Sequence, residues 1–161
     1  MEPLELIEKY RDKGVLLDTN LMVLLAIGLY KRERISSFKR TDKYTNRDFS
    51  LMIGLLGQFQ QRITTPHILT ETDNLTRQLP TNEHAAIAAT MTLLIDEHFE
   101  IRRPSAYAAR HPRYADVGLA DCMTITATEG VLVLTDDFRL ANILSHLGRD
   151  AVNINHLRTF N

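Results

Sequence analysis

The chain has 161 residues, of which 44% are hydrophobic, and it carries a single cysteine and a formal net charge of -1. This length suits one compact domain with a substantial core and is short for two ordinary domains, so we expect a single domain over residues 1–161. The single cysteine excludes an internal disulfide framework and a CxxC redox site, and the near-neutral charge gives no global indication of nucleic-acid binding.

The N-terminal segment and the apolar runs predict where the protein is found. Residues 1–14 are charged throughout and lack the apolar core of a signal peptide. The longest apolar run, residues 21–27, is far shorter than the roughly 20 residues that a membrane span needs. We therefore expect a cytoplasmic protein that does not enter a membrane.

The first half of the chain predicts a strand followed by helices. Residues 14–18 (GVLLD) form an apolar run that ends in Asp-Thr-Asn, which is typical of a buried parallel strand with polar residues at its C-terminal end. A helix is expected over residues 21–29. Apolar residues recur at helical spacing from Phe49 to Ile63, and the polar stretch before them, residues 32–46, is predicted to be a mobile excursion.

The middle of the chain predicts two further helices. Thr65 is a favourable N-cap and Pro66 a favourable first-turn residue, so we expect a helix that carries Glu71. Residues 82–98 are rich in Ala and Leu and predict another helix, which residues 98–101 follow as a short strand.

The last third predicts alternating helices and strands. Asp116 or a neighbour is expected to cap a helix that ends at Gly130, before an apolar strand over residues 131–134. A helix over residues 137–147 and a strand over residues 151–154 complete the pattern. The alternation predicts an α/β fold, a three-layer α/β/α sandwich with a mainly parallel central sheet.

Acidic residues lie just after or inside predicted elements that are far apart in the chain. Asp18 and the Asp136-Asp137 pair follow apolar strands, at the edge where ligands bind in open parallel sheets. Each of these residues has an alternative role as a helix N-cap. Glu71 and Asp121 are expected beyond the first turn of their helices, where an unpaired carboxylate would be costly to bury.

Clustered carboxylates would make a metal site. Carboxylates that lie close together raise one another's pKa until a cation offsets their charge. Ligation by oxygen alone suits Mg²⁺ or Mn²⁺ better than zinc. Such an ion can activate water for attack on a phosphodiester bond, so the acidic residues predict a metal-dependent nuclease.

Basic residues are concentrated in two stretches that could bind a phosphate backbone. Between residues 31 and 47, seven basic residues stand against two acidic ones. We expect this stretch to bind substrate, through Lys31, Arg32, Arg34, Lys39 and Arg40. A second group surrounds residues 104–112, and the alternative for either stretch is a solvated loop.

Four motifs occur in order along the chain: VLLDTN at residues 15–20, PHILTE at 66–71, ADCMTITAT at 120–128 and VLVLTDDF at 131–138. Together they resemble the PIN domain, a family of metal-dependent ribonucleases that includes the toxin nucleases of bacterial toxin-antitoxin systems. The resemblance covers residues 14–155. It implies a PIN-like sandwich and an RNA substrate, with a homodimer and an antitoxin or other inhibitory protein as partners.

The resemblance also implies roles for individual residues. Asp18, Asp121 and Asp137 match acids that would hold Mg²⁺ or Mn²⁺, and Glu71 would orient or deprotonate the attacking water. The Thr-x-Asp pattern favours Asp137 over Asp136 as the residue that faces the metal. The auxiliary residues would be Asn20, Thr135 and Asp116.

Other interpretations remain open at this point. A phosphatase of the haloacid dehalogenase type needs a second acid two residues after the first, where this chain has Asn20. A receiver domain needs an early acidic pair that we cannot place. The stronger alternative is a non-catalytic PIN-like module that binds metal or RNA. The segment between the first helix and PHILTE is longer and more basic than in compact toxins, which leaves substrate and partner open.

Overall fold

A computed structural model describes residues 1–158 and shows a five-stranded sheet. Its strands are β1 (Val15–Leu17), β2 (Arg62–Thr64), β3 (Phe99–Glu100), β4 (Leu132–Thr135) and β5 (Ala151–Asn153). They lie in the order β3-β2-β1-β4-β5, and each pairing is parallel. The predicted α/β class with a mainly parallel sheet is therefore confirmed.

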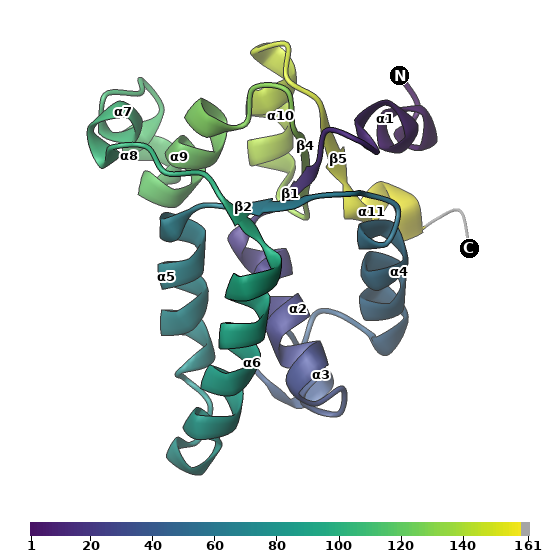
Figure 1. The fold of residues 1–161 in the computed structure, drawn as a ribbon, viewed down its shortest axis with the longest axis vertical. Coiled ribbons are helices and arrows are strands. Elements are labelled where there is room, and N and C mark those ends of the chain that lie inside the picture. Colours follow the sequence, from purple (N-terminus) through teal and green to yellow (C-terminus); the bar gives the residue numbers. More distant parts are fainter. Residues whose placement is uncertain (159–161) are drawn as a thin grey trace.

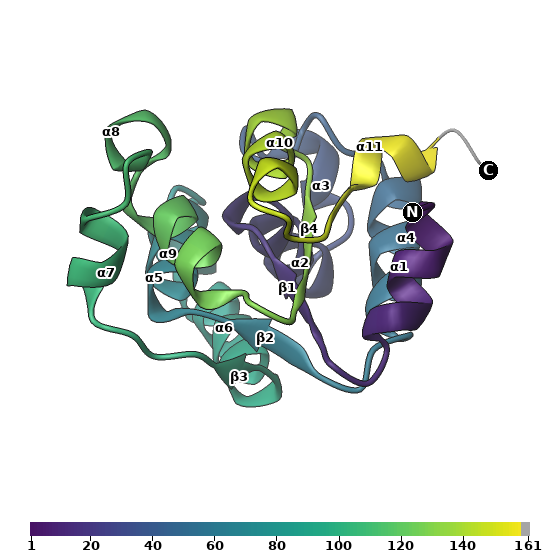
Figure 2. The same ribbon diagram turned by 90° about the horizontal axis from the view of Figure 1, so that it is seen from above.

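Helices lie on both faces of this sheet. They are α1 (Pro3–Tyr10), α2 (Thr19–Tyr30), α3 (Arg34–Ser37), α4 (Asn46–Leu56), α5 (Pro66–Thr76), α6 (His84–Glu97), α7 (Ser105–Ala109), α8 (Tyr114–Val117), α9 (Leu119–Ala127), α10 (Phe138–His146) and α11 (Ile154–Leu157), with a 3-10 turn, η1 (Thr81–Glu83). Figure 1 shows α2, α5 and α6 on one side and α1 and α10 on the other, and Figure 2 shows the same elements from above. This arrangement is compatible with an α/β/α sandwich. Within residues 1–158, no helix is long and apolar enough to cross a membrane.

The central helix α2 is apolar on all its sides because neighbours cover it all round. It packs against β1 and β4 and against α4, α5 and α6, and residues 21–27 are all buried. Gly28 allows α4 to approach closely, since a Cβ atom there would overlap the ring of Phe49. The position of α2 fixes its first residues, and with them Asp18, at the C-terminal end of β1.

The apolar residues from Phe49 to Ile63 do not all lie in one helix. The predicted helix is wrong at its C-terminal end. Helix α4 ends at Leu56, and Ile63 lies in β2, where it pairs with Leu16. A strand of three residues is too short to show its own periodicity. The pairing with β1 is what makes this segment a strand.

The polar segment 32–46, predicted to be a mobile excursion, is tied to the core instead. Ile35, Phe38 and Tyr44 are buried, and the Thr41 hydroxyl donates to the Ile35 carbonyl oxygen at 2.9 Å. These few anchors are separated by charged residues, so they form no pattern that sequence reading detects.

The helix predicted to begin near Asp116 is two helices. Gly118, with φ of +85°, separates α8 from α9, and this left-handed conformation favours glycine. Asp116 lies inside α8 and the N-cap of α9 is Gly118, so of the predicted caps it is a neighbour of Asp116, and not Asp116 itself, that begins this helix. Asp121 lies in the first turn of α9, so the expectation that it lies beyond the first turn of its helix is wrong.

Candidate active site

The four predicted acids line a single cleft at the C-terminal edge of the sheet. The cleft has a volume of about 200 Å³, and its acidic lining residues are Asp18, Glu71, Asp121 and Asp137. They come from the β1–α2 junction, from α5, from α9 and from the β4–α10 junction. No basic side chain lines the cleft within the described part of the chain.

Asp18 is the most deeply buried of these acids. It is the N-cap of α2, where its Oδ1 accepts a hydrogen bond from the Leu21 backbone N–H at 2.9 Å. Its Oδ2 accepts a hydrogen bond from the hydroxyl of Thr135. Burial raises the pKa of Asp18 from 3.8 to about 7, against these two hydrogen bonds, and the charges of Asp136 and Asp121 add to the rise.

Asp137 occupies the equivalent position at the start of α10. Its Oδ1 accepts hydrogen bonds from the backbone N–H groups of Arg139 at 2.7 Å and Leu140 at 3.3 Å. The Thr135 hydroxyl oxygen accepts from the Asp137 backbone N–H at 2.9 Å, so Thr135 joins the two acids. Asp18 and Asp137 are thus both N-caps.

Asp121 and Glu71 face the same cleft from the helices α9 and α5. No hydrogen bond or ion pair involves the Asp121 carboxylate within residues 1–158. Burial raises its pKa from 3.8 to about 6, with further contributions from the charges of Asp137 and Glu71. Glu71 accepts a hydrogen bond from the Thr19 hydroxyl at 3.3 Å.

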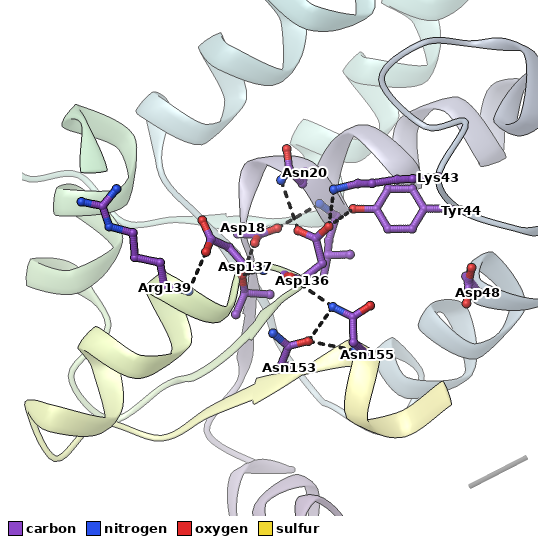
Figure 3. Close-up of polar contacts among 12 residues, drawn as sticks. Asp18, Asn20, Lys43, Tyr44, Asp48, Asp136, Asp137, Arg139, Asn153 and Asn155 are labelled. Carbon is purple, nitrogen blue, oxygen red and sulfur yellow. Dashed lines mark hydrogen bonds and ion pairs between the residues drawn. The ribbon is translucent and has the colours of Figure 1, made fainter. Parts of the chain in front are cut away.

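Asp136 is held away from the cleft by three donors (Figure 3). Its carboxylate accepts from Lys43 Nζ at 2.5 Å, from the Tyr44 hydroxyl at 2.6 Å and from Asn20 Nδ2 at 3.1 Å. Burial favours the neutral form of Asp136, but these hydrogen bonds outweigh it and lower its pKa below 3.8. Of the adjacent pair, Asp137 therefore lines the cleft, and Asn20 orients Asp136.

The basic residues predicted to bind substrate do not line the cleft. Lys31 is the C-cap of α2, and Asp18 is its N-cap, so a 12-residue helix of about 18 Å separates them. Arg34 pairs with the buried carboxylate of Glu83. Arg40 donates to Gln78 Oε1 at 2.8 Å.

The two other members of this predicted group have different surroundings. Arg32 stacks on the ring of Phe49 and donates to Ser50, and Lys39 is exposed. Farther along the basic stretch, Lys43 reaches the acidic edge, where it pairs with Asp136.

Sequence reading missed two basic residues beside the acids. Lys43 lies in the basic stretch that predicted phosphate binding, yet its partner is Asp136. Arg139 lies two residues after Asp137 and pairs with Asp116 at 3.7 Å, as Arg113 does at 3.1 Å. Asp116 itself does not line the cleft. The only sequence signal for Arg139 was its position in the first turn after an acidic N-cap.

The donor set of the cleft fits a hard divalent cation, although the side chains are not gathered around one point. In the described part of the chain, no group of three or more His, Cys, Asp or Glu side chains is placed to hold a metal ion. The ionisable lining groups are all carboxylates, the type of ligand that Mg²⁺ and Mn²⁺ prefer. Burial is the largest cause of the raised pKa values of Asp18 and Asp121, and neighbouring carboxylates add to both. Metal binding would therefore require the side chains to turn toward one another.

Comparison of the chain with protein-family models, with characterised proteins and with solved structures found no match. The PIN resemblance consequently has only the motifs of this chain as support.

Proposed function

We propose that this protein is a PIN-like, metal-dependent ribonuclease that hydrolyses phosphodiester bonds of RNA at the acidic cleft. The observation that supports it best is the meeting of Asp18, Glu71, Asp121 and Asp137 in one cleft that no basic side chain lines among the described residues. Ionisable groups with perturbed pKa values in a cleft are typical of functional sites. A structural N-cap role accounts for Asp18 and Asp137, but the Asp121 carboxylate has no hydrogen-bonding partner among residues 1–158.

In this proposal each acidic residue has its own role in the reaction. Asp18, Asp121 and Asp137 hold Mg²⁺ or Mn²⁺, directly or through water. The bound ion would activate water and stabilise charge on the leaving oxygen. Glu71 takes the proton of the attacking water, and the hydrogen bond from Thr19 orients it. Thr135 holds Asp18 in position relative to the start of α10.

A cleavage assay tests the proposal. Purified protein is incubated with single-stranded and structured RNAs in Mg²⁺, in Mn²⁺ or in EDTA. We expect cleavage only with metal, and a loss of at least about 100-fold in Asp121→Asn. Asp73→Asn is the matched control, because Asp73 lies on α5 close to Glu71 but pairs with the exposed Arg77. Full activity of Asp121→Asn, or cleavage in EDTA, would show that the cleft is not the active site.

A second candidate is a PIN-like module that binds metal or RNA without cleaving it. It is favoured by the spread of the acidic side chains, none of which form a ready metal site in the described residues, and by the neutralisation of Asp136 by Lys43. Calorimetric binding of Mn²⁺ without cleavage of any RNA would identify this module. No observation favours the haloacid dehalogenase phosphatase, since Asn20 donates its amide to Asp136.

The remaining expectations belong to the same proposal. A homodimer and an inhibitory partner such as an antitoxin follow from the PIN resemblance, and a cytoplasmic location from the charged N-terminal segment and the short apolar runs. Size-exclusion chromatography with light scattering tests the dimer.

A further inference from the structure

A second hollow, with a volume of about 650 Å³, lies beside the acidic cleft between residues 111–113 and α10. Arg139 connects the two, because it lines the hollow while its backbone N–H donates to Asp137 in the cleft. We infer that this hollow binds one nucleotide of the RNA strand next to the bond that is cut, with its phosphate on Arg113 and Arg139. The inference rests on the proposed ribonuclease function and names the surface that holds its substrate.

The charges of the hollow suit a phosphate. Arg113 and Arg139 line it, and no acidic side chain does so among residues 1–158. Both guanidinium groups pair with Asp116, but the side chains of Arg113 and Arg139 are 52% and 56% exposed. Exposed ion pairs of this kind are weak, so a phosphate that approaches can compete for them. The planar guanidinium fork matches two phosphate oxygens.

The histidines of the hollow offer complementary hydrogen-bonding groups. His111 Nδ1 accepts from the Arg113 backbone N–H at 3.1 Å, so in the neutral ring Nε2 carries the proton and donates. His146 Nδ1 lies 2.7 Å from the Asn142 carbonyl oxygen, which can only accept, so Nε2 of the neutral ring is an acceptor. One donor and one acceptor suit the edge of a nucleobase, which displays both.

Two apolar side chains that line the hollow suit the flat face of a base. Ile143 and Leu147 line it, and Leu147 is 51% exposed. The volume is within the range of about 300 to 1,000 Å³ that small-molecule sites occupy. The hollow therefore combines an apolar surface, polar ring nitrogens and two guanidinium groups, which are the three features that a nucleotide requires.

Binding is measured with a 5′-labelled single-stranded RNA in EDTA, where cleavage does not interfere, by fluorescence anisotropy at increasing NaCl. The test protein carries Arg113→Gln and Arg139→Gln together, and a second variant, Leu147→Glu, places a negative charge in the hollow. Arg77→Gln is the matched control, since Arg77 is 57% exposed and pairs with Asp73 one turn away on its own helix.

We expect the double variant to bind RNA at least about tenfold more weakly, with a salt dependence reduced by about 0.7 for each lost phosphate contact. Leu147→Glu should weaken binding similarly, and Arg77→Gln should bind like the wild type. Wild-type affinity in the double variant or in Leu147→Glu would overturn the inference, as would an equal loss in Arg77→Gln. Because binding is read in EDTA, a failure here is separate from a failure of metal-dependent cleavage.

Discussion

Neutralising Asp18 should stabilise the metal-free protein, although the same change should abolish cleavage. The side chain is 4% exposed, and its burial raises the pKa from 3.8 to about 7. At about pH 8 the folded protein must therefore keep a charge that its surroundings disfavour, whereas the unfolded chain ionises freely. The difference between the two pKa values corresponds to on the order of 4 kcal/mol of lost stability.

The sign of this effect follows from the order in which the two states lose their proton. Below about pH 4, Asp18 is neutral in both states and contributes no penalty. Between about pH 4 and about pH 7 the unfolded chain ionises first, so the folded state becomes progressively less stable, and above about pH 7 the penalty is complete.

The net effect of Asp18→Asn includes one lost hydrogen bond. The amide oxygen of Asn can still accept from the Leu21 N–H, but the hydroxyl of Thr135 loses its acceptor, which costs about 1 kcal/mol. We therefore expect a gain of about 2 to 3 kcal/mol in the free energy of unfolding at about pH 8, and a loss of about 1 kcal/mol at about pH 4.

Urea denaturation in EDTA, followed by circular dichroism across this pH range, measures the difference between the two proteins. A difference that does not change with pH would refute the reasoning, because it would mean that Asp18 does not ionise with a raised pKa in the folded state. Millimolar Mg²⁺ should then narrow the gap by stabilising only the wild type, if Asp18 is a metal ligand.

Three other changes give distinct outcomes. Asp48→Asn should lower the free energy of unfolding by about 1 to 3 kcal/mol in urea denaturation. It removes the charge that pairs with Arg158 and turns one of the two acceptors, at 2.8 and 3.1 Å from Arg158, into an amide donor. Unchanged stability would contradict this. Gly28→Ala should cost about 1 to 3 kcal/mol through overlap with Phe49, and a wild-type melting temperature would count against the close packing of α2 and α4. Mn²⁺ should raise the melting temperature of the wild type but not of Asp121→Asn, and equal shifts in both proteins would place the metal elsewhere.

Sequence alone predicted the class of the fold because the decisive signals are local. The strands β1 and β4 are covered on both faces, so they appear as continuous apolar runs. The N-cap Thr65 and the following Pro66 mark the start of α5 without reference to the rest of the chain. The strand β2 and the break at Gly118 were missed, because a three-residue strand depends on its pairing with β1 and a glycine break depends on a backbone angle.

The sequence by itself placed Asp18 and Asp137 at one edge, since the carboxyl ends of parallel strands share that edge, whereas Glu71 and Asp121 lie on helices and were grouped with them only by the resemblance. Only the tertiary structure decided how each of them is used. It placed Lys43 on Asp136, left Asp121 without a hydrogen-bonding partner in the described residues, and set Arg139 between the cleft and the larger hollow. These contacts join segments that are distant in the chain, and their charges and burial depend on packing, which no local pattern of residues encodes.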